Sequence, residues 1–128
     1  MCKTIFVVDD DEGILTSIKA ILELEGYKVI TQNQNCKKLH EIITTTAPQL
    51  ILLDVLIADN DGRIICKKLK TDKTIANIPI ILFSALHQTA DNYAEFGADG
   101  FIAKPFDVDE LLFMIENKIS ESVIKKPH

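Results

Sequence analysis

The sequence predicts an α/β fold in which helices cover both faces of a five-stranded parallel sheet. Two observations lead to this prediction. Five short apolar runs recur along the chain, and none of them shows the alternation of a strand that has one face in water. The segments between and after them carry apolar residues at helical spacing. Because right-handed crossovers join consecutive parallel strands, this repeated pattern forms a doubly wound sheet.

The predicted strands consist mainly of β-branched, aromatic and leucine side chains. Runs of this kind without polar alternation are typical of strands that are buried on both faces. The sheet should therefore lie at the centre of the molecule, with no face exposed to water. The predicted strands are residues 4–8, 28–31, 50–53, 80–83 and 101–103.

The predicted helices follow these strands, and the fourth, over residues 89–96, has the weakest pattern. The first ends near Gly26, because glycine is a common stop signal at the end of a helix. The second ends before Pro48. The apolar stripes are Ile14, Ile18, Ile21 and Leu22 in the first helix; Leu39, Ile42 and Ile43 in the second; Ile64, Ile65 and Leu69 in the third; and Val108, Leu111, Leu112, Ile115 and Ile119 in the fifth.

Length and charge limit the possible functions. The 128 residues suffice for one globular domain, which we expect to span residues 1–120, with a short tail at 121–128 and no output domain. The hydrophobic content of 47% argues against disorder. The net charge of -5 gives no reason to expect direct nucleic acid binding, which usually requires a basic surface. A protein or small-molecule partner is expected.

The cysteines and the longest apolar runs indicate the compartment. Cys2, Cys36 and Cys66 are odd in number and too widely spaced for a zinc ribbon or a redox pair. They are typical of thiols in a reducing compartment. No apolar run approaches the roughly 20 residues of a membrane span, and no signal-peptide core precedes the first acids. We expect a cytoplasmic protein with no membrane segment.

Polar residues follow four of the five predicted strands. Because the carboxyl ends of parallel strands meet at one edge of the sheet, and open sheets of this kind bind ligands there, these side chains predict a site. Their neighbouring carboxylates repel one another, so a cation should compensate for them. The residues are Asp9, Asp10 and Asp11 after the first strand, Asp54 after the third, Ser84 after the fourth and Lys104 after the fifth.

Taken singly, these residues have ordinary structural interpretations. Asp11 is expected to cap the helix that follows it, where an acid also suits the helix dipole. A lone Asp54 could form a turn, and a lone Lys104 could lie on the surface. Taken together, three converging carboxylates suit Mg²⁺, and a carboxylate can act as a nucleophile toward phosphorus. Asp54 would then be the nucleophile, with Lys104 and Ser84 stabilising the developing charge.

Four motifs stand in a specific order and spacing. They are Val7-Val8-Asp9-Asp10, Leu52-Leu53-Asp54, Phe83-Ser84-Ala85 and Ala103-Lys104-Pro105-Phe106. With them the chain resembles, from end to end, a response-regulator receiver domain of two-component signalling. The resemblance implies a flavodoxin-like three-layer sandwich with strand order 2-1-3-4-5.

The resemblance also implies the chemistry of the site. Asp54 would accept a phosphoryl group from the phosphohistidine of a sensor histidine kinase or a histidine phosphotransfer protein. Mg²⁺ would be held by Asp10, Asp54 and the backbone carbonyl of Leu56, with Asp9 helping through water. Lys104 would pair with the phosphoryl group.

The family further implies a conformational switch. The hydroxyl of Ser84 would turn toward the phosphoryl group, and the ring of Phe101 would move inward with it. Plain core packing is the alternative for Phe101, and both can hold in the resting protein. The surface over residues 89–120 would then bind a downstream protein, with the chain as a monomer or as a phosphorylation-dependent dimer.

The loop after Asp54 departs from the family. The family often has Met-Pro-x-Met-Asp-Gly where this chain has Ile57-Ala58-Asp59-Asn60-Asp61-Gly62. Losing the proline removes a backbone constraint, so we expect a more mobile loop with unchanged chemistry.

Three alternatives remain. A small phosphatase with an Asp nucleophile, as in haloacid-dehalogenase-like enzymes, would carry a second Asp where this chain has Leu56. A flavodoxin-like or dinucleotide-binding module would need a glycine-rich or hydroxyl-rich phosphate loop, and no predicted strand is followed by one. A pseudo-receiver would keep the fold without phosphorylation, and the complete set of acids, hydroxyl and lysine argues against it. We therefore expect a signalling domain that reacts with itself, not an enzyme in the turnover sense.

Overall fold

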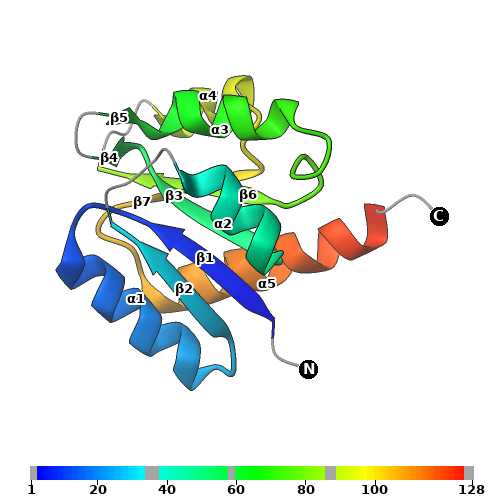
Figure 1. Cartoon of the computed structure of the whole chain (residues 1–128). Coiled ribbons are helices and arrows are strands. Elements are labelled where there is room, and N and C mark those ends of the chain that lie inside the picture. The colour runs from blue at the N-terminus through cyan, green and yellow to red at the C-terminus, as the bar shows by residue number, and fades with distance from the viewer. Residues whose placement is uncertain (1–2, 34–37, 58–59, 86–88, 126–128) are drawn as a thin grey trace.

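The computed structural model describes residues 3–33, 38–57, 60–85 and 89–125. A parallel sheet of five strands in the order β2-β1-β3-β6-β7 forms its centre (Figure 1). With the two short strands described below left out of the count, this is the order 2-1-3-4-5, so the predicted fold is confirmed. The strands are β1 (Thr4–Val8), β2 (Lys28–Gln32), β3 (Leu50–Asp54), β6 (Ile80–Ser84) and β7 (Gly100–Ala103).

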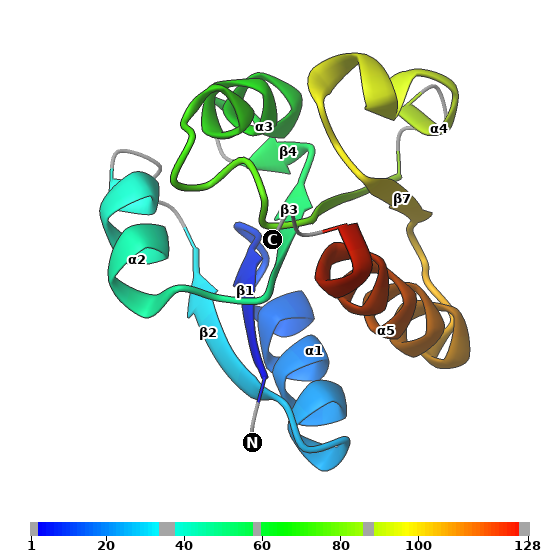
Figure 2. The ribbon, with the colours of Figure 1, turned by 90° about the vertical axis from the view of Figure 1, so that its right-hand side faces the viewer.

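Helices cover both faces of this sheet (Figure 2). On one face, α1 (Glu12–Leu24) and α5 (Val108–Lys125) pack on side chains such as Val7 and Phe83. On the other face, α2 (Leu39–Thr46) and α3 (Gly62–Thr71) pack on side chains such as Phe6 and Leu53. Because the strands contribute side chains to both apolar clusters in alternation, neither face is left to solvent. The fold is therefore a three-layer sandwich.

The register of the strands brings their carboxyl ends level with one another. Val8 at the end of β1 is paired with Gln32 in β2 and with Leu53 in β3. One step further along the sheet, Asp54 is paired with Phe83. Polar residues that end or follow these strands therefore emerge at the same edge of the sheet.

Side-chain caps fix the starts of the two helices that follow β1 and β3. Asp11 accepts hydrogen bonds from the backbone N–H groups of Gly13 at 2.9 Å and Ile14 at 3.3 Å, which confirms its predicted role as a helix cap. Asp61 does the same for α3 by accepting from the N–H of Arg63 at 2.9 Å. Both caps satisfy backbone donors that have no partner within the helix.

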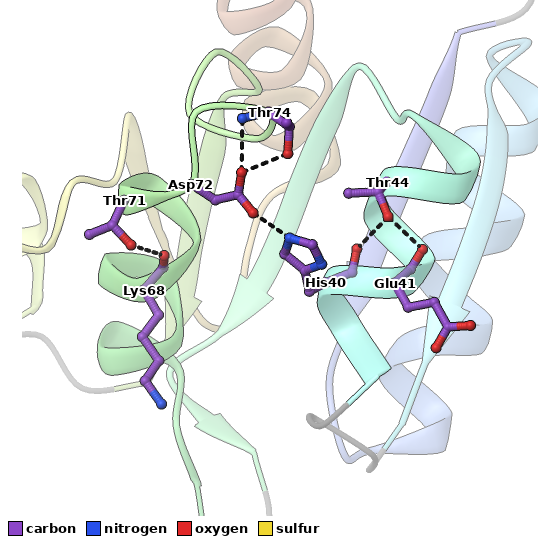
Figure 3. Close-up of polar contacts among 7 residues, drawn as sticks. All are labelled: His40, Glu41, Thr44, Lys68, Thr71, Asp72 and Thr74. Carbon is purple, nitrogen blue, oxygen red and sulfur yellow. Dashed lines mark hydrogen bonds and ion pairs between the residues drawn. The ribbon is translucent and has the colours of Figure 1, made fainter.

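A polar cluster on the surface joins α2 to the turn behind α3 (Figure 3). A ring nitrogen of His40 in α2 contacts the carboxylate of Asp72. The same carboxylate accepts hydrogen bonds from Thr74, through its N–H at 2.9 Å and its hydroxyl at 2.6 Å. These Thr74 bonds, helped by His40, hold the pKa of Asp72 below its ordinary value. The cluster anchors the chain where it leaves α3 toward β6.

Two short strands were not predicted. β4 (Leu56–Ile57) and β5 (Asn60–Asp61) pair antiparallel between β3 and α3. They occupy the loop in which the family proline is missing, and residues 58–59 of that loop lie outside the described part of the chain. A two-residue pair is too short to produce a periodic signal in the sequence.

The third and fourth helices differ from the prediction in detail. Ile64, which the sequence predicts to lie in the apolar stripe of the third helix, is 51% exposed, so this part of the prediction is wrong. The buried residue Cys66 stands two positions, or about 200° of helix rotation, from it, so Ile64 points to the opposite side. The fourth helix is short: α4 (Thr89–Asn92) continues as the 3-10 helix η2 (Tyr93–Phe96), in line with its weak apolar pattern.

The carboxyl-terminal helix is longer than expected. α5 runs on past the predicted domain end at residue 120 and reaches Lys125. None of the helices in the described ranges is long and apolar enough to cross a membrane.

Candidate functional site

The predicted site residues meet at the carboxyl edge of the sheet. Asp9 follows β1, Asp54 ends β3, Ser84 ends β6 and Lys104 follows β7. Three of these polar residues are buried: the exposed fractions are 0% for Asp9, 4% for Asp54 and 2% for Ser84. Burial of polar groups costs free energy unless they find partners, so their grouping here indicates a functional site.

Backbone hydrogen bonds extend the sheet by one residue on both sides of Asp54, which itself ends β3. The N–H of Asp9 donates to the carbonyl of Gln32 at 3.2 Å, and the N–H of Lys104 donates to the carbonyl of Ser84 at 2.9 Å. Directly after Asp54, the N–H of Val55 donates to the carbonyl of Phe83 at 3.1 Å. The site residues are therefore positioned by the sheet itself and not by a free loop. A rigid support of this kind favours precise chemistry.

Lys104 lies between the two buried carboxylates. Its Nζ is 3.0 Å from Oδ2 of Asp9 and 3.3 Å from Oδ1 of Asp54. The same ammonium lies 4.7 Å from the centroid of the Phe83 ring, within the range of a cation–π contact. Lys104 thus brings a positive charge to the phosphoacceptor position that the sequence predicts.

Asp54 has a strongly perturbed acidity. Its pKa is raised from the ordinary 3.8 to about 7: burial makes the largest contribution, the negative charge of Asp9 adds to it, and Lys104 opposes both effects. Perturbed groups of this kind cluster at functional sites. An additional cation near Asp54 would favour its charged form, which is the nucleophilic form.

The three carboxylates fit a magnesium ion. One oxygen each of Asp9, Asp10 and Asp54 lie within 4.8 Å of one another. Asp10 is exposed while the other two are buried, so the group is open to water on one side. Mg²⁺ prefers a few carboxylate ligands together with several waters, and this donor set offers both.

The remaining predicted residues lie around this centre. Phe101 is half-buried and packs against the apolar cluster between the sheet and the helices α2 and α3, which agrees with the core-packing role considered for it. The side chain of Leu56 is exposed, and its backbone lies in β4, two residues after Asp54. Their predicted roles as switch and as carbonyl ligand stay predictions.

Gly62 is a site residue whose role the sequence did not reveal. A Cβ atom at this position would lie 1.9 Å from the backbone carbonyl oxygen of Asp54. Only glycine allows the start of α3 to approach the peptide of Asp54 so closely. The chain shares the Asp61-Gly62 pair with the family motif, and the close approach to Asp54 explains why the second position needs glycine.

Comparison with known proteins decides the family. The model of the response regulator receiver domain matches residues 5–116. The chain belongs to the receiver domain family. This receiver is 36% identical over 129 residues to the alkaline phosphatase synthesis transcriptional regulatory protein PhoP of Bacillus subtilis, covering 99% of this chain and 52% of that protein. It is 36% identical over 110 residues to the DNA-binding dual master transcriptional regulator RpaA of Synechocystis, covering 84% of this chain and 45% of that protein.

Solved structures of receiver domains superpose closely on this chain. A CheY-like response regulator receiver domain protein from Methanospirillum hungatei superposes with a TM-score of 0.86 at 29% identity, over 98% of this chain and all of that one. The signal receiver domain of a histidine kinase from Syntrophus aciditrophicus gives 0.85 at 29% identity, over 99% of this chain and 96% of that one. The chain spans about half the length of the curated relatives it matches.

Replacing Asp54 by Asn is expected to stabilise the metal-free receiver at pH 8. The pKa of this carboxyl is about 7 in the folded protein against 3.8 as its ordinary value, so the folded state binds the proton more tightly. The stability contributed by Asp54 is therefore present below pH 4 and lost as the pH rises through 7. Asp9 and Lys104 can rearrange around the charged carboxylate of the wild type and so reduce its unfavourable effect. We therefore expect the free energy of unfolding to rise by about 2 kcal/mol in Asp54→Asn at pH 8.

Urea unfolding in a metal chelator at pH 5 and pH 8 measures this effect. The gain should be clearly smaller at pH 5, where Asp54 of the wild type is already protonated in the folded state. Glu23→Gln, at an exposed position of α1, serves as the control and should leave the pH dependence unchanged. Equal pH dependence of Asp54→Asn and wild type would contradict the prediction.

Proposed function

We propose that this receiver accepts a phosphoryl group on Asp54 from the phosphohistidine of a sensor histidine kinase or a histidine phosphotransfer protein. The observation that carries the proposal is the buried Asp54 carboxylate, which lies 3.3 Å from the ammonium of Lys104 and beside two further carboxylates. A buried carboxylate with a fixed cation and a metal-ligand set around it suits a nucleophile for phosphorus.

In the transfer, a carboxylate oxygen of Asp54 forms a bond to phosphorus as the bond between phosphorus and the donor imidazole nitrogen breaks. The imidazole keeps the electron pair and takes up a proton, and the receiver is left with an acyl phosphate. The sheet orients Asp54 as the two reactants meet, because the N–H of its neighbour Val55 is bonded to Phe83 in β6. A fixed position of Asp54 lowers the entropy cost of bringing the two reactants into line.

Lys104 has two partners before the transfer and would gain a third. In the resting protein its ammonium is shared between Asp9 and Asp54. When a phosphoryl group joins Asp54, the ammonium would pair with a phosphoryl oxygen and so stabilise the charge that develops there. Ser84, which ends the neighbouring strand, would turn its hydroxyl to the same group, and Phe101 would follow as the switch.

Mg²⁺ is the cofactor that the carboxylates fit. Asp10, Asp54 and the backbone carbonyl of Leu56 would hold it, with Asp9 helping through water. When bound, Mg²⁺ supplies positive charge that offsets the phosphoryl oxygens and the carboxylates.

The surface beside the site suits a protein donor. A cavity of about 620 Å³ lies between the start of α1 and the loop after β7, with Lys104 in its wall. Ile14, Pro105 and Phe106 give this wall an apolar character. An apolar surface next to Lys104 could seat an apolar side chain of a partner protein beside the charged site.

The phosphorylated receiver would then signal through protein contact. We assign the binding surface to residues 89–120, the receiver domain to 1–120 and the site of action to the cytoplasm, with the chain as a monomer or a phosphorylation-dependent dimer. The regulator RpaA is by its name DNA-binding, but this chain covers less than half of it, so any output domain remains outside this proposal.

Incubation with acetyl phosphate and Mg²⁺, followed by intact mass measurement, tests the proposal. The wild type should gain the mass of one phosphoryl group, and Asp54→Asn should gain none. Asp91→Asn, at an exposed acid in α4, is the matched control and should gain the same mass as the wild type. No added mass in the wild type would favour a pseudo-receiver, and equal labelling of Asp54→Asn would place the phosphoacceptor elsewhere.

A further inference from the structure

The first turn of α3 lies directly against the peptide of the phosphoacceptor. The N–H of Gly62 donates to the carbonyl of Val55 at 2.6 Å. The space beside Gly62 is filled by the carbonyl of Asp54, which a Cβ atom at Gly62 would approach to 1.9 Å. A shift of the Asp54 peptide must therefore displace the start of α3, because tightly packed atoms transmit displacement.

Arg63, the next residue, is locked to the cap of the same helix. Its Nε and Nη2 donate to the two carboxylate oxygens of Asp61 at 3.0 and 2.8 Å. Asp61 in turn is paired with Leu56 across the short β4–β5 hairpin that follows the phosphoacceptor. The guanidinium thus takes its position from the loop that carries Leu56. Both partners are partly buried, with side chains 27% and 35% exposed, so the two-bond contact is more than a solvated surface pair.

The flat face of the same guanidinium contacts a different element. The central carbon of the Arg63 group lies 5.5 Å from the centroid of the Phe96 ring, in the range of a cation–π contact. Phe96 ends η2, and Gly97 follows it with a left-handed φ of 80°. β7, which carries Phe101 and leads to Lys104, begins only a few residues later. Arg63 therefore bridges the loop after Asp54 and the segment that enters the predicted switch surface.

Only an arginine can make both contacts at once. Its flat, charged group can place two N–H donors on a carboxylate while its face lies over an aromatic ring. A lysine would keep the charge and could still reach Asp61, but it would lose the two-bond geometry and the flat contact with Phe96.

We propose that Arg63 is a positioning residue that couples the state of Asp54 to the position of η2. The route runs from the Asp54 peptide through Gly62 and Asp61 to Arg63 and Phe96, and it is separate from the route through Ser84 and Phe101. The inference rests on the proposed function in one respect, namely that Asp54 has a phosphorylated state to report.

Backbone amide chemical shifts test this role, with beryllium fluoride and Mg²⁺ added as a stable mimic of the phosphoryl group. In the wild type we expect shift changes at Val55 and Gly62, beside the site, and at residues 93–97. In Arg63→Lys and in Phe96→Leu the changes at Val55 and Gly62 should persist, while those at 93–97 fall to less than half. The double variant should show no further loss, because both changes break the same link.

Lys67→Gln, one turn further along α3 at an exposed position, is the matched control and should respond like the wild type. Unchanged responses at 93–97 in Arg63→Lys would overturn the coupling role while leaving the proposed function intact, whether or not Phe96→Leu folds. A wild type with no response at Val55 and Gly62 would instead refute the proposed function, and the coupling role with it. Arg63→Lys is the milder change, so the test does not depend on Phe96→Leu remaining folded.

Discussion

Gly62→Ala is expected to lower the free energy of unfolding of the receiver by about 3 kcal/mol, at the upper end of the usual cost of overpacking. The added methyl group would lie 1.9 Å from the carbonyl oxygen of Asp54, 2.9 Å from its carbonyl carbon and 3.0 Å from the Cα of Val55. All three atoms belong to the backbone, which β3 and the bond from Val55 to Phe83 hold in place. No flexible side chain is available to move aside.

The sign of this effect is unusual for a residue in a helix. Alanine is ordinarily favoured over glycine in helices by up to about 1 kcal/mol, so a neutral or stabilising Gly62→Ala would contradict the close approach. Gly13→Ala is the matched control, because its nearest atom would be the carboxylate Oδ1 of Asp11 at 3.2 Å, on a side chain that can yield. Urea unfolding of the two variants and the wild type gives the comparison. We also expect slower phosphorylation of Gly62→Ala, since the Asp54 peptide must shift.

Lys104→Met is expected to reduce the rate of phosphorylation of Asp54 at least about 100-fold, the usual cost of removing a charge-stabilising donor from an active site. It should also destabilise the metal-free protein. Removing one partner of a buried ion pair typically costs about 3–5 kcal/mol, and protonation of Asp54 would limit the loss here to about 2 kcal/mol at pH 8. Since Asp54 has a pKa of about 7 already in the wild type, the loss should be smaller at pH 5.

Magnesium separates the two effects of Lys104. Saturating Mg²⁺ should restore much of the stability of Lys104→Met, because the ion can balance Asp9 and Asp54, but it should leave the rate low, because the ammonium itself is missing. Phosphorylation by acetyl phosphate followed by mass measurement, and urea unfolding with and without Mg²⁺, provide the two readouts. Lys67→Met removes an exposed charge and is the control. A Lys104→Met protein phosphorylated at the wild-type rate would rule out the assigned role of Lys104.

Much of the sheet could be predicted from the sequence, because each strand is an uninterrupted apolar run in a chain of alternating patterns. β1 is observed with the predicted bounds, and β2 and β3 each extend one residue further. The grouping of Asp9, Asp54 and Lys104 could be predicted for the same reason: parallel strands place their carboxyl ends together, so the residue after each strand is located by topology alone.

Features that depend on the angle between elements could not be predicted. Ile64 has an apolar side chain and suitable spacing, yet α3 turns it to solvent. The contact between Arg63 and Phe96 joins two elements whose relative position no periodic pattern reveals. The short β4–β5 pair and the close approach of Gly62 to Asp54 arise in a loop, where hydrogen bonds and packing decide the course of the chain.

The ion pair between Asp9 and Lys104 joins residues that are 95 positions apart in the chain. A ribosome therefore completes the first carboxylates of the site long before it adds the lysine that lies between them. Until β7 has emerged and joined the edge of the sheet, a growing or truncated chain has Asp54 without its cation. On the proposed function, a chain that ends before Lys104 would therefore accept a phosphoryl group slowly, even though its first three strands could already have formed.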